Sequence, residues 1–305
     1  MEATELNVVT GAFSFSGRFI TERLLAQGKE VRTLTGHPER EHPFGSQVGI
    51  APLDFENHYA LVESLRGVAT LYNTYWIRFP RRQITFDAAV QNTKRLLRAA
   101  AEAGVRRIVH ISITNPSAES PLPYFRGKAL TEHAVIDSGL SYAILRPALL
   151  FGPGDVLINN IAWLLRHFPV FVILGAGDYR VQPVFVGDIA EIAVAAGQRD
   201  DNFTGDVVGP ETFTFNELVR LIADCVGSRA WTIHLPPSTV LFLARLIGYM
   251  TGDVVLTRNE VAGLTANLLV SDSEPNGVVA LSQWLRDNAA SVGIKYASEL
   301  TRHYR

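Results

Sequence analysis

The stretch VVTGAFSFSGRFITERLL, which begins at Val8, contains the residues best suited to bind an anion. An apolar run that predicts a buried strand ends at Gly11, and Gly17 opens a segment with helical periodicity. The free N–H groups and the positive dipole end of such a helix bind phosphate, and this layout is typical of α/β proteins that hold the pyrophosphate of a dinucleotide. Ser14 stands where a middle glycine is usual, and we expect its small side chain to be tolerated or to donate to a phosphate oxygen. A plain tight turn is the alternative for a motif of this length.

A second group of residues combines a phenol, an amine and two hydroxyls in neighbouring segments. Tyr124 and Lys128 lie four apart in YFRGK, at the start of a predicted helix, so both project from one face. A positioned side chain that exchanges a proton with a substrate contributes roughly 10²–10⁴ in rate. The preceding segment HISITN supplies the hydroxyls of Ser112 and Thr114, which could satisfy local backbone groups at a strand end. His110 alternates with the core positions of this segment and is interpreted as a packed histidine.

Short β-rich apolar runs alternate with helix-period segments through the first two thirds of the chain. The strand candidates are residues 6–10, 30–34, 48–52, 70–74, 107–112 and 141–145. The helix candidates between them include residues 18–28, 85–104 and 128–139, each of which ends in glycine as helices commonly do. This alternation predicts an α/β protein with a Rossmann-type doubly wound parallel sheet, covered by helices on both faces.

The regular alternation ends near residue 150. An apolar helix is predicted over residues 156–168 and is stopped by Pro169, and a further helix is predicted over residues 186–197. Residues 212–305 are expected to be mostly helical, with loops at HLPPST and SDSEPNG.

These patterns predict two domains. The first is a dinucleotide-binding domain over residues 1–155, completed by parts of 180–210. The second is a smaller, mainly helical C-terminal subdomain over residues 156–180 and 211–305. Such a subdomain would cap the carboxyl ends of the strands, where the ligands of open α/β sheets bind.

Composition limits the class of protein. With 305 residues, of which 47% are hydrophobic and 19% charged, the chain is typical of a soluble globular protein with a large core. The formal net charge of −2 argues against nucleic-acid binding as its main task, since that task favours a basic face. The single cysteine, Cys225, excludes an internal disulfide and is interpreted as a small buried residue. Zinc-type Cys/His spacings are absent from the sequence, so we expect no metal site.

No targeting or membrane-spanning segment is expected from the sequence. The N-terminus has no basic segment followed by an apolar core, as a signal peptide would. The longest apolar run, residues 238–250, is interrupted by Arg245 and is too short to span a bilayer. We therefore expect a cytoplasmic protein in which residues 238–250 form an exposed apolar helix.

Taken in order along the chain, these segments resemble the short-chain dehydrogenase/reductase superfamily. The G-x-x-G-x-x-G turn of that family corresponds to Gly11, Ser14 and Gly17, with the middle glycine replaced. The segments APLDF, LYNTYW and VQNTKRLLRAAAEAGVRRIVHIS resemble the third strand, the end of the fourth strand, and the long helix with the fifth strand. LRPALLFGPGD and VQPVFVGDIAEIAV resemble later segments of the family. The resemblance spans most of residues 6–226. It is closest to the extended and atypical members, which include nucleotide-sugar epimerase/dehydratases, NmrA-like proteins and accessory subunits of respiratory complex I.

The resemblance implies roles for individual residues. Lys128 would lower the pKa of Tyr124 from its reference value of about 10 and would hold the nicotinamide ribose. Tyr124 would exchange a proton with the substrate oxygen, and Ser112, with Thr114 as the alternate, would orient that oxygen. Asp54 would lie near the adenine. The residues expected to bind the cofactor are Gly11, Phe13, Ser14, Phe15, Ser16, Gly17, Arg18, Thr35, Asp54, Phe55, Asn73, Thr74, Tyr75, Asn92, Lys128 and Pro147.

The implied cofactor is a nicotinamide dinucleotide, and the sequence favours NADP over NAD. An NAD site usually carries an acid about 20 residues after the glycines, which bonds the ribose 2′-hydroxyl, but this region reads TLTGHPER with no acid at the strand end. A 2′-phosphate attracts cations, and Arg18, Arg32 and Arg40 are the candidates. Arg32 could equally lie mid-strand, and Arg40 could be a solvated loop residue.

Two segments are expected to wall a substrate pocket. The first, NTYWIRFPRR, supplies aromatic rings and arginines that could meet an anion: Tyr75, Trp76, Phe79, Arg78, Arg81 and Arg82. The second, INNIAWLLRHFPVFVIL, supplies the opposite wall: Trp163, Phe168, Asn159 and Asn160. A solvated basic loop is the alternative for the first segment, and a core or a partner interface is the alternative for the second. This lining is too apolar to be a first choice for a nucleotide sugar.

Three functions are compatible with these residues. The first is an NAD(P)-dependent oxidoreductase that acts on a small, fairly apolar carbonyl or alcohol. The second is a non-catalytic protein that holds NADPH as a redox sensor or assembly subunit, as a homodimer or docked to a larger complex. The missing middle glycine, the incomplete serine motif and the apolar run at 238–250 favour this second function. The third, a nucleotide-sugar epimerase or dehydratase, rests on the RPALLFG segment.

Overall fold

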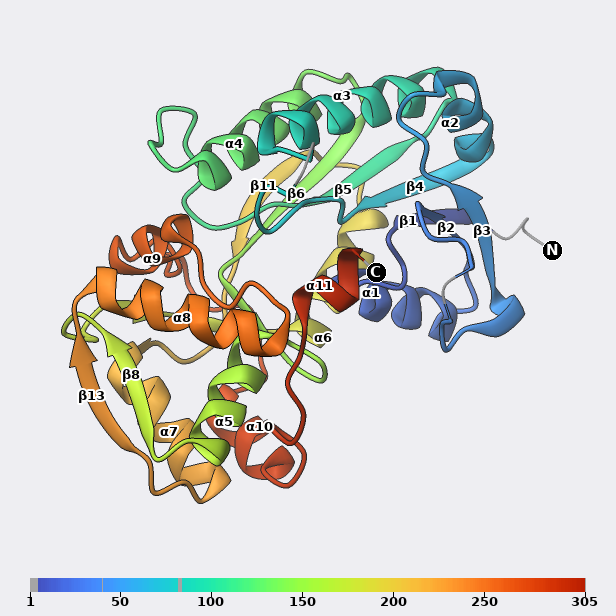
Figure 1. The fold of residues 1–305 in the computed structure, drawn as a ribbon. Helices are drawn as coiled ribbons and strands as arrows, with labels where there is room; N and C mark the ends of the chain where they lie inside the picture. Colours follow the sequence, from blue (N-terminus) through green and yellow to red (C-terminus); the bar gives the residue numbers. More distant parts are fainter. Residues whose placement is uncertain (1–4, 40, 82–83, 305) are drawn as a thin grey trace. The chain divides into compact units, whose positions relative to one another are not determined.

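The computed structural model describes residues 5–39, 41–81 and 84–304 of the chain (Figure 1). Its internal contacts divide the chain into two units, each made of two segments. The first unit comprises Met1–Pro147 and Gly187–Asp206, and the second comprises Ala148–Val186 and Val207–Arg305. In the structure, the chain passes from the first unit to the second after Pro147, whereas the sequence predicted this boundary after residue 155.

The first unit is built on a seven-stranded sheet with the spatial order β11-β6-β5-β4-β1-β2-β3. The strands are β1 (Leu6–Thr10), β2 (Glu30–Thr35), β3 (Val48–Pro52), β4 (Val68–Asn73), β5 (Arg107–Ile111), β6 (Ser141–Pro147) and β11 (Phe203–Val207). Every neighbouring pair from β6 to β3 is parallel. The six strands expected from the sequence are all present, with ends that differ by at most two residues. The strand order reverses between β1 and β4, and in such doubly wound sheets ligands bind beyond the carboxyl ends at the reversal.

Aliphatic side chains explain why these segments form strands that are buried on both faces. Val8, Leu34, Leu71, Ile108 and Ile144 come from five adjacent strands, are fully buried and belong to one core cluster. Parallel strands covered by helices on both sides show such continuous apolar runs. The expected α/β fold with a Rossmann-type sheet is confirmed.

Helices cover both faces of this sheet. They are α1 (Phe15–Ala26), the 3₁₀ helix η1 (Gly45–Gln47), α2 (His58–Leu65), α3 (Phe86–Glu102), α4 (Pro123–Ile136) and α6 (Val186–Gly197). Helices α2, α3 and α4 lie along one face, and α1 and α6 lie along the other (Figure 1). The helix α2 was not expected from the sequence. Asn57, whose side chain accepts a hydrogen bond from the Ala60 amide, is the capping signal that could have indicated it.

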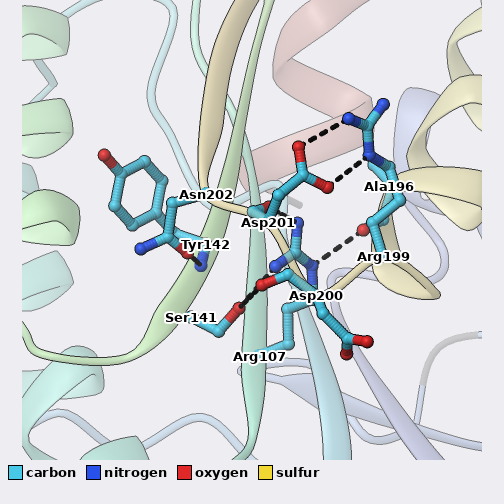
Figure 2. A network of polar contacts seen from close by, with 8 residues as sticks. All are labelled: Arg107, Ser141, Tyr142, Ala196, Arg199, Asp200, Asp201 and Asn202. Atoms are coloured by element: carbon cyan, nitrogen blue, oxygen red, sulfur yellow. Dashed lines mark hydrogen bonds and ion pairs between the residues drawn. The ribbon is translucent and has the colours of Figure 1, made fainter.

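Arg107, the first residue of β5, ties the second segment of the first unit, Gly187–Asp206, to the sheet (Figure 2). Its guanidinium is buried and donates from Nε to the Ala196 carbonyl and from Nη2 to the Asp201 carbonyl, both at 2.8 Å. It also donates to Ser141 Oγ, and Arg199 forms two hydrogen bonds with the Asp201 carboxylate. Because these partners belong to α6 and to the turn before β11, the network fixes both elements to β5 and β6. It lies at the amino end of β5, away from the carboxyl ends of the strands.

The second unit combines helices with small two-stranded sheets. Its elements are β7 (Leu149–Phe151), α5 (Leu157–His167), β8 (Val170–Leu174), β9 (Arg180–Val181), β10 (Pro183–Phe185), β12 (Phe213–Thr214), α7 (Phe215–Val226), β13 (Trp231–Leu235), α8 (Pro237–Thr251), α9 (Arg258–Thr265), α10 (Leu281–Asn288) and α11 (Glu299–Tyr304). The parallel pair β8 and β13 corrects the expectation for the segment HLPPST, because His234 and Leu235 belong to β13 rather than to a loop.

Side chains from α5, α7 and α10 meet in the core of the second unit, with Ile158, Leu218 and Leu285 fully buried. The helix α5 ends at His167, two residues before Pro169, as expected. Within the part of the chain that the structure describes, no helix is both long and apolar enough to cross a membrane. Over the same residues, His, Cys, Asp and Glu side chains do not gather in groups of three or more that could hold a metal ion.

Candidate functional site

The glycines of the turn between β1 and α1 are both required by the backbone. Gly11 has a φ of +68°, a conformation that residues with a Cβ rarely adopt. A Cβ added to Gly17 would lie 2.2 Å from the Gly11 carbonyl oxygen, so the start of α1 packs directly on the turn. Ala12 and Ser14 complete the turn, with their amides donating to Thr33 Oγ1 (3.0 Å) and to the Gly11 carbonyl (2.8 Å). Gly11 therefore permits the turn, and Gly17 permits the start of α1 to pack against it.

Ser14 is the N-cap residue of α1, and its half-buried side chain makes no capping hydrogen bond. Its Oγ lies 3.0 Å from the position of a Cβ on Gly17, so the hydroxyl points into the turn. The amide of Ser16, in the first turn of α1, has no acceptor within the helix, and no acidic residue lies in that turn. This end of α1 fits a diphosphate, because the Ser16 amide and the positive dipole end of the helix can interact with an anion. Phe15 packs edge-on against Phe19 in the same turn (6.1 Å).

The loop that follows β4 is fixed beside this turn. Thr10 Oγ1 accepts hydrogen bonds from the amides of Thr74 (2.8 Å) and Tyr75 (3.1 Å), and Thr74 Oγ1 donates to the Thr10 carbonyl (2.5 Å). Asn73 Oδ1 accepts from Thr10 Oγ1 (3.2 Å) and from the Tyr75 amide (3.2 Å). The predicted residues Asn73 and Thr74 are therefore brought to the glycine turn, and Thr10 is a residue that sequence reasoning missed.

A chain of buried hydrogen bonds continues from Asn73 to α4. Asn73 Nδ2 lies 3.0 Å from His110 Nδ1, and His110 Nε2 lies 3.3 Å from Thr131 Oγ1. Because Thr131 donates its own proton to the Lys128 carbonyl (2.7 Å), it accepts from Nε2, and His110 carries its proton there. Burial, with a smaller contribution from Lys128, lowers the pKa of His110 to about 3, so the imidazole is neutral. His110 is the packed histidine that we expected, and it joins the turn to the helix of the Tyr/Lys pair.

Lys128 is buried in the same region. Its Nζ donates to the Ile111 carbonyl at 2.9 Å and lies 5.0 Å from the centroid of the Trp76 ring. Burial lowers the pKa of Lys128 to about 7, and the charge of Glu132 opposes this shift. The carboxylate of Glu132 is itself paired with Arg146 (2.5 Å) and does not bond Lys128. Lys128 therefore has the burial and lowered pKa that are common at functional sites.

Tyr124 lies one turn before Lys128 on α4, as the spacing predicted. Its ring makes edge contacts with Trp76 (5.9 Å between centroids) and with Phe86 (5.8 Å). Trp76 stacks on Phe86 at 5.9 Å, and its indole nitrogen is buried without a hydrogen-bond partner among the described residues. The predicted substrate residue Trp76 is thus placed against both members of the Tyr/Lys pair.

Ser112 follows β5 directly and is 4% exposed. Its amide donates to the Leu145 carbonyl (2.7 Å), whereas its Oγ has no hydrogen-bond partner in the described part of the chain. The neighbouring residue, Ile111, is the one whose carbonyl holds Lys128. Thr114 is also buried, and its amide donates to the carbonyl of Pro147 (3.0 Å). Of the two predicted hydroxyls, Ser112 has the unpaired oxygen.

The remaining predicted cofactor residues lie at the ends of β2 and β3 and on α3. Thr35 Oγ1 accepts from the His37 amide (3.0 Å), and the exposed Asp54 accepts from the Glu56 amide (3.0 Å). Phe55 packs against Tyr75 with ring centroids 4.8 Å apart, and Asn92 Nδ2 donates to the Tyr75 hydroxyl (3.0 Å). Phe55 and Asn92 therefore hold Tyr75 in place, which is a role that the sequence did not indicate.

The structure separates the three arginines considered for a 2′-phosphate. Arg32 lies within β2 and donates to the Ser64 carbonyl (2.9 Å), as the mid-strand alternative for this residue implied. Arg40 lies outside the described residues. Arg18, in the first turns of α1, pairs with Glu22 at 3.5 Å and is about one-third exposed. Arg18 is thus the candidate that lies on the helix whose amino end faces the turn.

An aromatic stack beside the turn was missed by the sequence reasoning. The rings of Phe13 and His42 are parallel, with centroids 4.1 Å apart, and Phe44 lies 6.3 Å from Phe13. The loop after β2 is therefore folded onto the predicted cofactor residue Phe13. The motif gave no signal for this contact, because it joins segments about 30 residues apart.

The predicted loop after β4 buries one of its aromatic rings. Phe79 is buried, Arg78 lies over its ring at 5.7 Å, and Arg81 forms a backbone bridge to Ile84. Arg82 lies outside the described residues.

In the second unit, the predicted residues of α5 make contacts with the C-terminal segment. Asn160 donates to the Ala297 carbonyl (2.9 Å) and accepts from its amide (2.8 Å). Asn159 donates to the Lys295 carbonyl (2.8 Å) and accepts from the Gly293 amide (3.0 Å). These bonds account for both asparagine side chains without a ligand. Nearby on α5, the ring of Trp163 contacts three others: His167, Phe168 and Tyr296.

Several known proteins are similar to this chain. Residues 11–155 match a family model described as NAD(P)H-binding. The chain is 25% identical to the mitochondrial NADH dehydrogenase [ubiquinone] 1 alpha subcomplex subunit 9 of Arabidopsis thaliana, over 87% of this chain and 71% of that protein. It is 31% identical to the (4-alkanoyl-5-oxo-2,5-dihydrofuran-3-yl)methyl phosphate reductase of Streptomyces griseus, over 72% of this chain and 73% of that protein.

Among solved structures, the triphenylmethane reductase of Citrobacter sp. in complex with NADP(H) is similar with a TM-score of 0.74. The match covers 93% of this chain and 99% of that chain at 19% sequence identity. A likeness at this level of identity concerns the fold.

Proposed function

Because the chain belongs to the NAD(P)H-binding, atypical short-chain dehydrogenase/reductase family, we propose that it is an NADPH-dependent oxidoreductase acting on a small, fairly apolar carbonyl or alcohol. The observation that carries this proposal is the hydroxyl of Ser112, which is buried and unpaired among the described residues. A buried polar atom without a partner is costly and calls for an explanation. A substrate oxygen is the partner that this hydroxyl lacks.

The chain's own residues would divide the chemistry as follows. Tyr124 would give a proton to the substrate oxygen or take it back, and Lys128 would assist that phenol and bind the nicotinamide ribose, as the resemblance implies. Ser112 donates its hydroxyl proton to the same substrate oxygen and orients it. The rings of Trp76 and Phe86 pack around Tyr124 and shield its ring from water. When bound, NADPH supplies the hydride.

Replacement of Tyr124 tests the proton-transfer role. In a screen of carbonyl substrates with NADPH, we expect the variant Tyr124→Phe to lower kcat by at least about tenfold while NADPH binding is kept. The control is Tyr59→Phe, since Tyr59 is exposed on α2 and should leave kcat unchanged. An unchanged kcat in Tyr124→Phe would remove Tyr124 from the mechanism.

The carrying observation has a separate test. Ser112→Ala removes a hydroxyl that forms no hydrogen bond in the described chain, so the free energy of unfolding should stay the same or rise. If Ser112 orients the substrate, kcat/KM should nevertheless fall by at least about tenfold. A loss of stability with normal kcat/KM would mean that the hydroxyl is a structural element.

The preference for NADPH over NADH rests on the region after β2 and on Arg18. The strand ends at Thr35 with no acid among the three residues that follow it, where an acid could bind a ribose 2′-hydroxyl, and Arg18 offers a cation on α1. We expect Arg18→Gln to weaken NADPH binding by about tenfold and to leave NADH binding unchanged. Equal losses for the two cofactors would assign Arg18 to the helix surface instead.

A second candidate function is a nucleotide-binding subunit without turnover. It is favoured by a match at 25% identity, which covers 87% of the chain, to a protein named as a subunit of NADH dehydrogenase. It is also favoured by Lys128 Nζ, which is held by the Ile111 carbonyl. If NADPH copurifies or binds tightly and no carbonyl substrate is turned over, this function replaces the first one.

A further inference from the structure

Helix α8 of the second unit has its small residues buried and its large apolar residues exposed. Val240, Ala244 and Gly248 are at positions i, i+4 and i+8 and form the buried face. The exposed large side chains are Phe242 (58% exposed), Leu246 (49%), Tyr249 (91%) and Met250 (75%). Helices on the surface of soluble proteins normally show the opposite arrangement, with the large apolar residues facing the core. This face of α8 is the exposed apolar helix that the sequence led us to expect.

The helix is fixed in this orientation by close packing on its buried face. A Cβ added to Gly248 would lie 2.6 Å from the Asp253 carbonyl oxygen, so no larger residue fits between α8 and the following turn. Val240 belongs to the core cluster of the second unit. Rotation of α8 to bury Phe242 or Leu246 would replace these small residues with large ones at the same contact. The large side chains therefore stay on the outside.

Helix α8 carries a single charge, which is positive. Over residues 237–251 there is no acidic residue, and the only charged side chain is Arg245, which is exposed. At 100° per residue, Arg245 lies at the margin of the arc that contains Phe242, Leu246, Tyr249 and Met250. The face is thus an apolar strip with a cation at its edge.

We propose that this face of α8 docks in the interface of an anionic phospholipid bilayer. Interfacial helices lie in the membrane plane with an apolar face buried and with basic residues at the headgroups, and their binding grows with apolar area and with anionic lipid. Tyr249 suits the headgroup region because its ring is apolar and its hydroxyl is polar. Arg245 has a long apolar stem that lets its charge reach the phosphates. With 15 residues, α8 is long enough to lie on a bilayer but not to cross it.

A second copy of the chain fits this face less well. Two copies of α8 packed antiparallel through the same strip would share a two-fold axis near the middle of the helix. Arg245 is one residue from that middle, so the axis would place two arginines side by side with no acid on either helix to pair with them. Anionic lipid phosphates attract the charge of Arg245.

Vesicle sedimentation tests the proposal without any cofactor or substrate, so its outcome is independent of the proposed function. The full chain is mixed with phosphatidylcholine vesicles that either contain or lack phosphatidylglycerol, and the bound fraction is measured after pelleting. We expect binding to the anionic vesicles that falls by at least about tenfold in the double variant Phe242→Gln/Leu246→Gln. Arg245→Gln should weaken binding to the anionic vesicles by about fivefold and should leave the neutral ones unaffected.

A matched control changes two other exposed apolar residues. Tyr59 (73% exposed) and Ile136 (45% exposed) lie in the first unit, and Tyr59→Gln/Ile136→Gln should bind vesicles like the wild type. Equal loss in the two double variants would overturn the assignment to α8. Absence of vesicle binding by the wild type would overturn the proposal, as would a concentration-dependent dimer in gel filtration that the Phe242→Gln/Leu246→Gln variant abolishes.

Discussion

The indole of Trp76 lies against the backbone of Gly127. A Cβ added at residue 127 would be 2.7 Å from Trp76 Cη2 and 3.1 Å from Cζ2, distances at which one group must move. The same ring lies below the amino group of Lys128 at 5.0 Å. The glycine in YFRGK is therefore needed to place the aromatic ring that covers the neighbouring lysine.

This contact predicts a coupled pair of substitutions. We expect Gly127→Ala to lower the free energy of unfolding by about 1–3 kcal/mol, because the added methyl group overpacks the site. Trp76→Leu removes the ring atoms that would clash, so the double variant should be more stable than the sum of the single effects predicts. Urea unfolding of the four proteins measures this coupling. Gly205→Ala is the control, since a Cβ there meets nothing within 4 Å, and additive single effects would contradict the assigned contact.

Local patterns were sufficient to predict most of the sheet in the first unit. Strands such as β1 are continuous apolar runs followed by glycine turns, and both signals are local in the sequence. The strand β8 was missed because VFVIL continues the apolar character of α5, and periodicity does not separate short buried strands from helices. Only the pairing of β8 with β13, some 60 residues later, identifies it as a strand.

The candidate site was predictable where its residues belong to one motif. Gly11, Gly17 and the Tyr124/Lys128 pair were found in this way. The polar chain through His110 was not, because it depends on β4 lying next to β5, with Asn73 opposite His110 in the register. No sequence spacing encodes a pairing of residues that are 37 positions apart.

The close packing at Gly17 predicts that one added methyl group will weaken cofactor binding. Gly17→Ala would bring a Cβ to 2.2 Å from the Gly11 carbonyl oxygen, so the start of α1 must shift away from the turn. We expect NADPH affinity to fall by at least about tenfold, because the first-turn amides would no longer face the diphosphate. Titration of NADPH fluorescence measures the effect. The control Gly205→Ala should bind normally, and normal binding by Gly17→Ala would show that the diphosphate is held elsewhere.

The lowered pKa of His110 predicts that the folded chain loses stability in acid. Its pKa is about 3 in the folded chain and 6.5 as a reference for the unfolded chain. Between these values the unfolded state binds a proton that the folded state does not, so the stabilising contribution is complete above about pH 6.5. It then falls by about 1.4 kcal/mol per pH unit as the pH is lowered.

Urea unfolding at pH 7, 6 and 5 compares the wild type with His110→Gln. The variant should be less stable at pH 7, because the hydrogen bonds to Asn73 and Thr131 are changed, but its stability should depend less on pH. His133→Gln, at an exposed position of α4, is the control and should follow the wild type. Parallel pH profiles for wild type and His110→Gln would show that His110 does not titrate in this range.

The lowered pKa of Lys128 predicts that the protein takes up a proton when it binds the cofactor above neutral pH. Burial lowers its pKa to about 7, so at pH 8 most of the free protein carries a neutral amine. A bound diphosphate and ribose hydroxyls favour the ammonium form and raise this pKa, so affinity should fall as the pH rises above about 7. Calorimetry at pH 8 in buffers of different ionisation enthalpy should show net proton uptake that is much smaller at pH 6, where the amine is already charged. Lys128→Met should abolish the uptake and Lys94→Met, on α3, should keep it. An uptake at pH 8 that persists in Lys128→Met would assign the proton to another group.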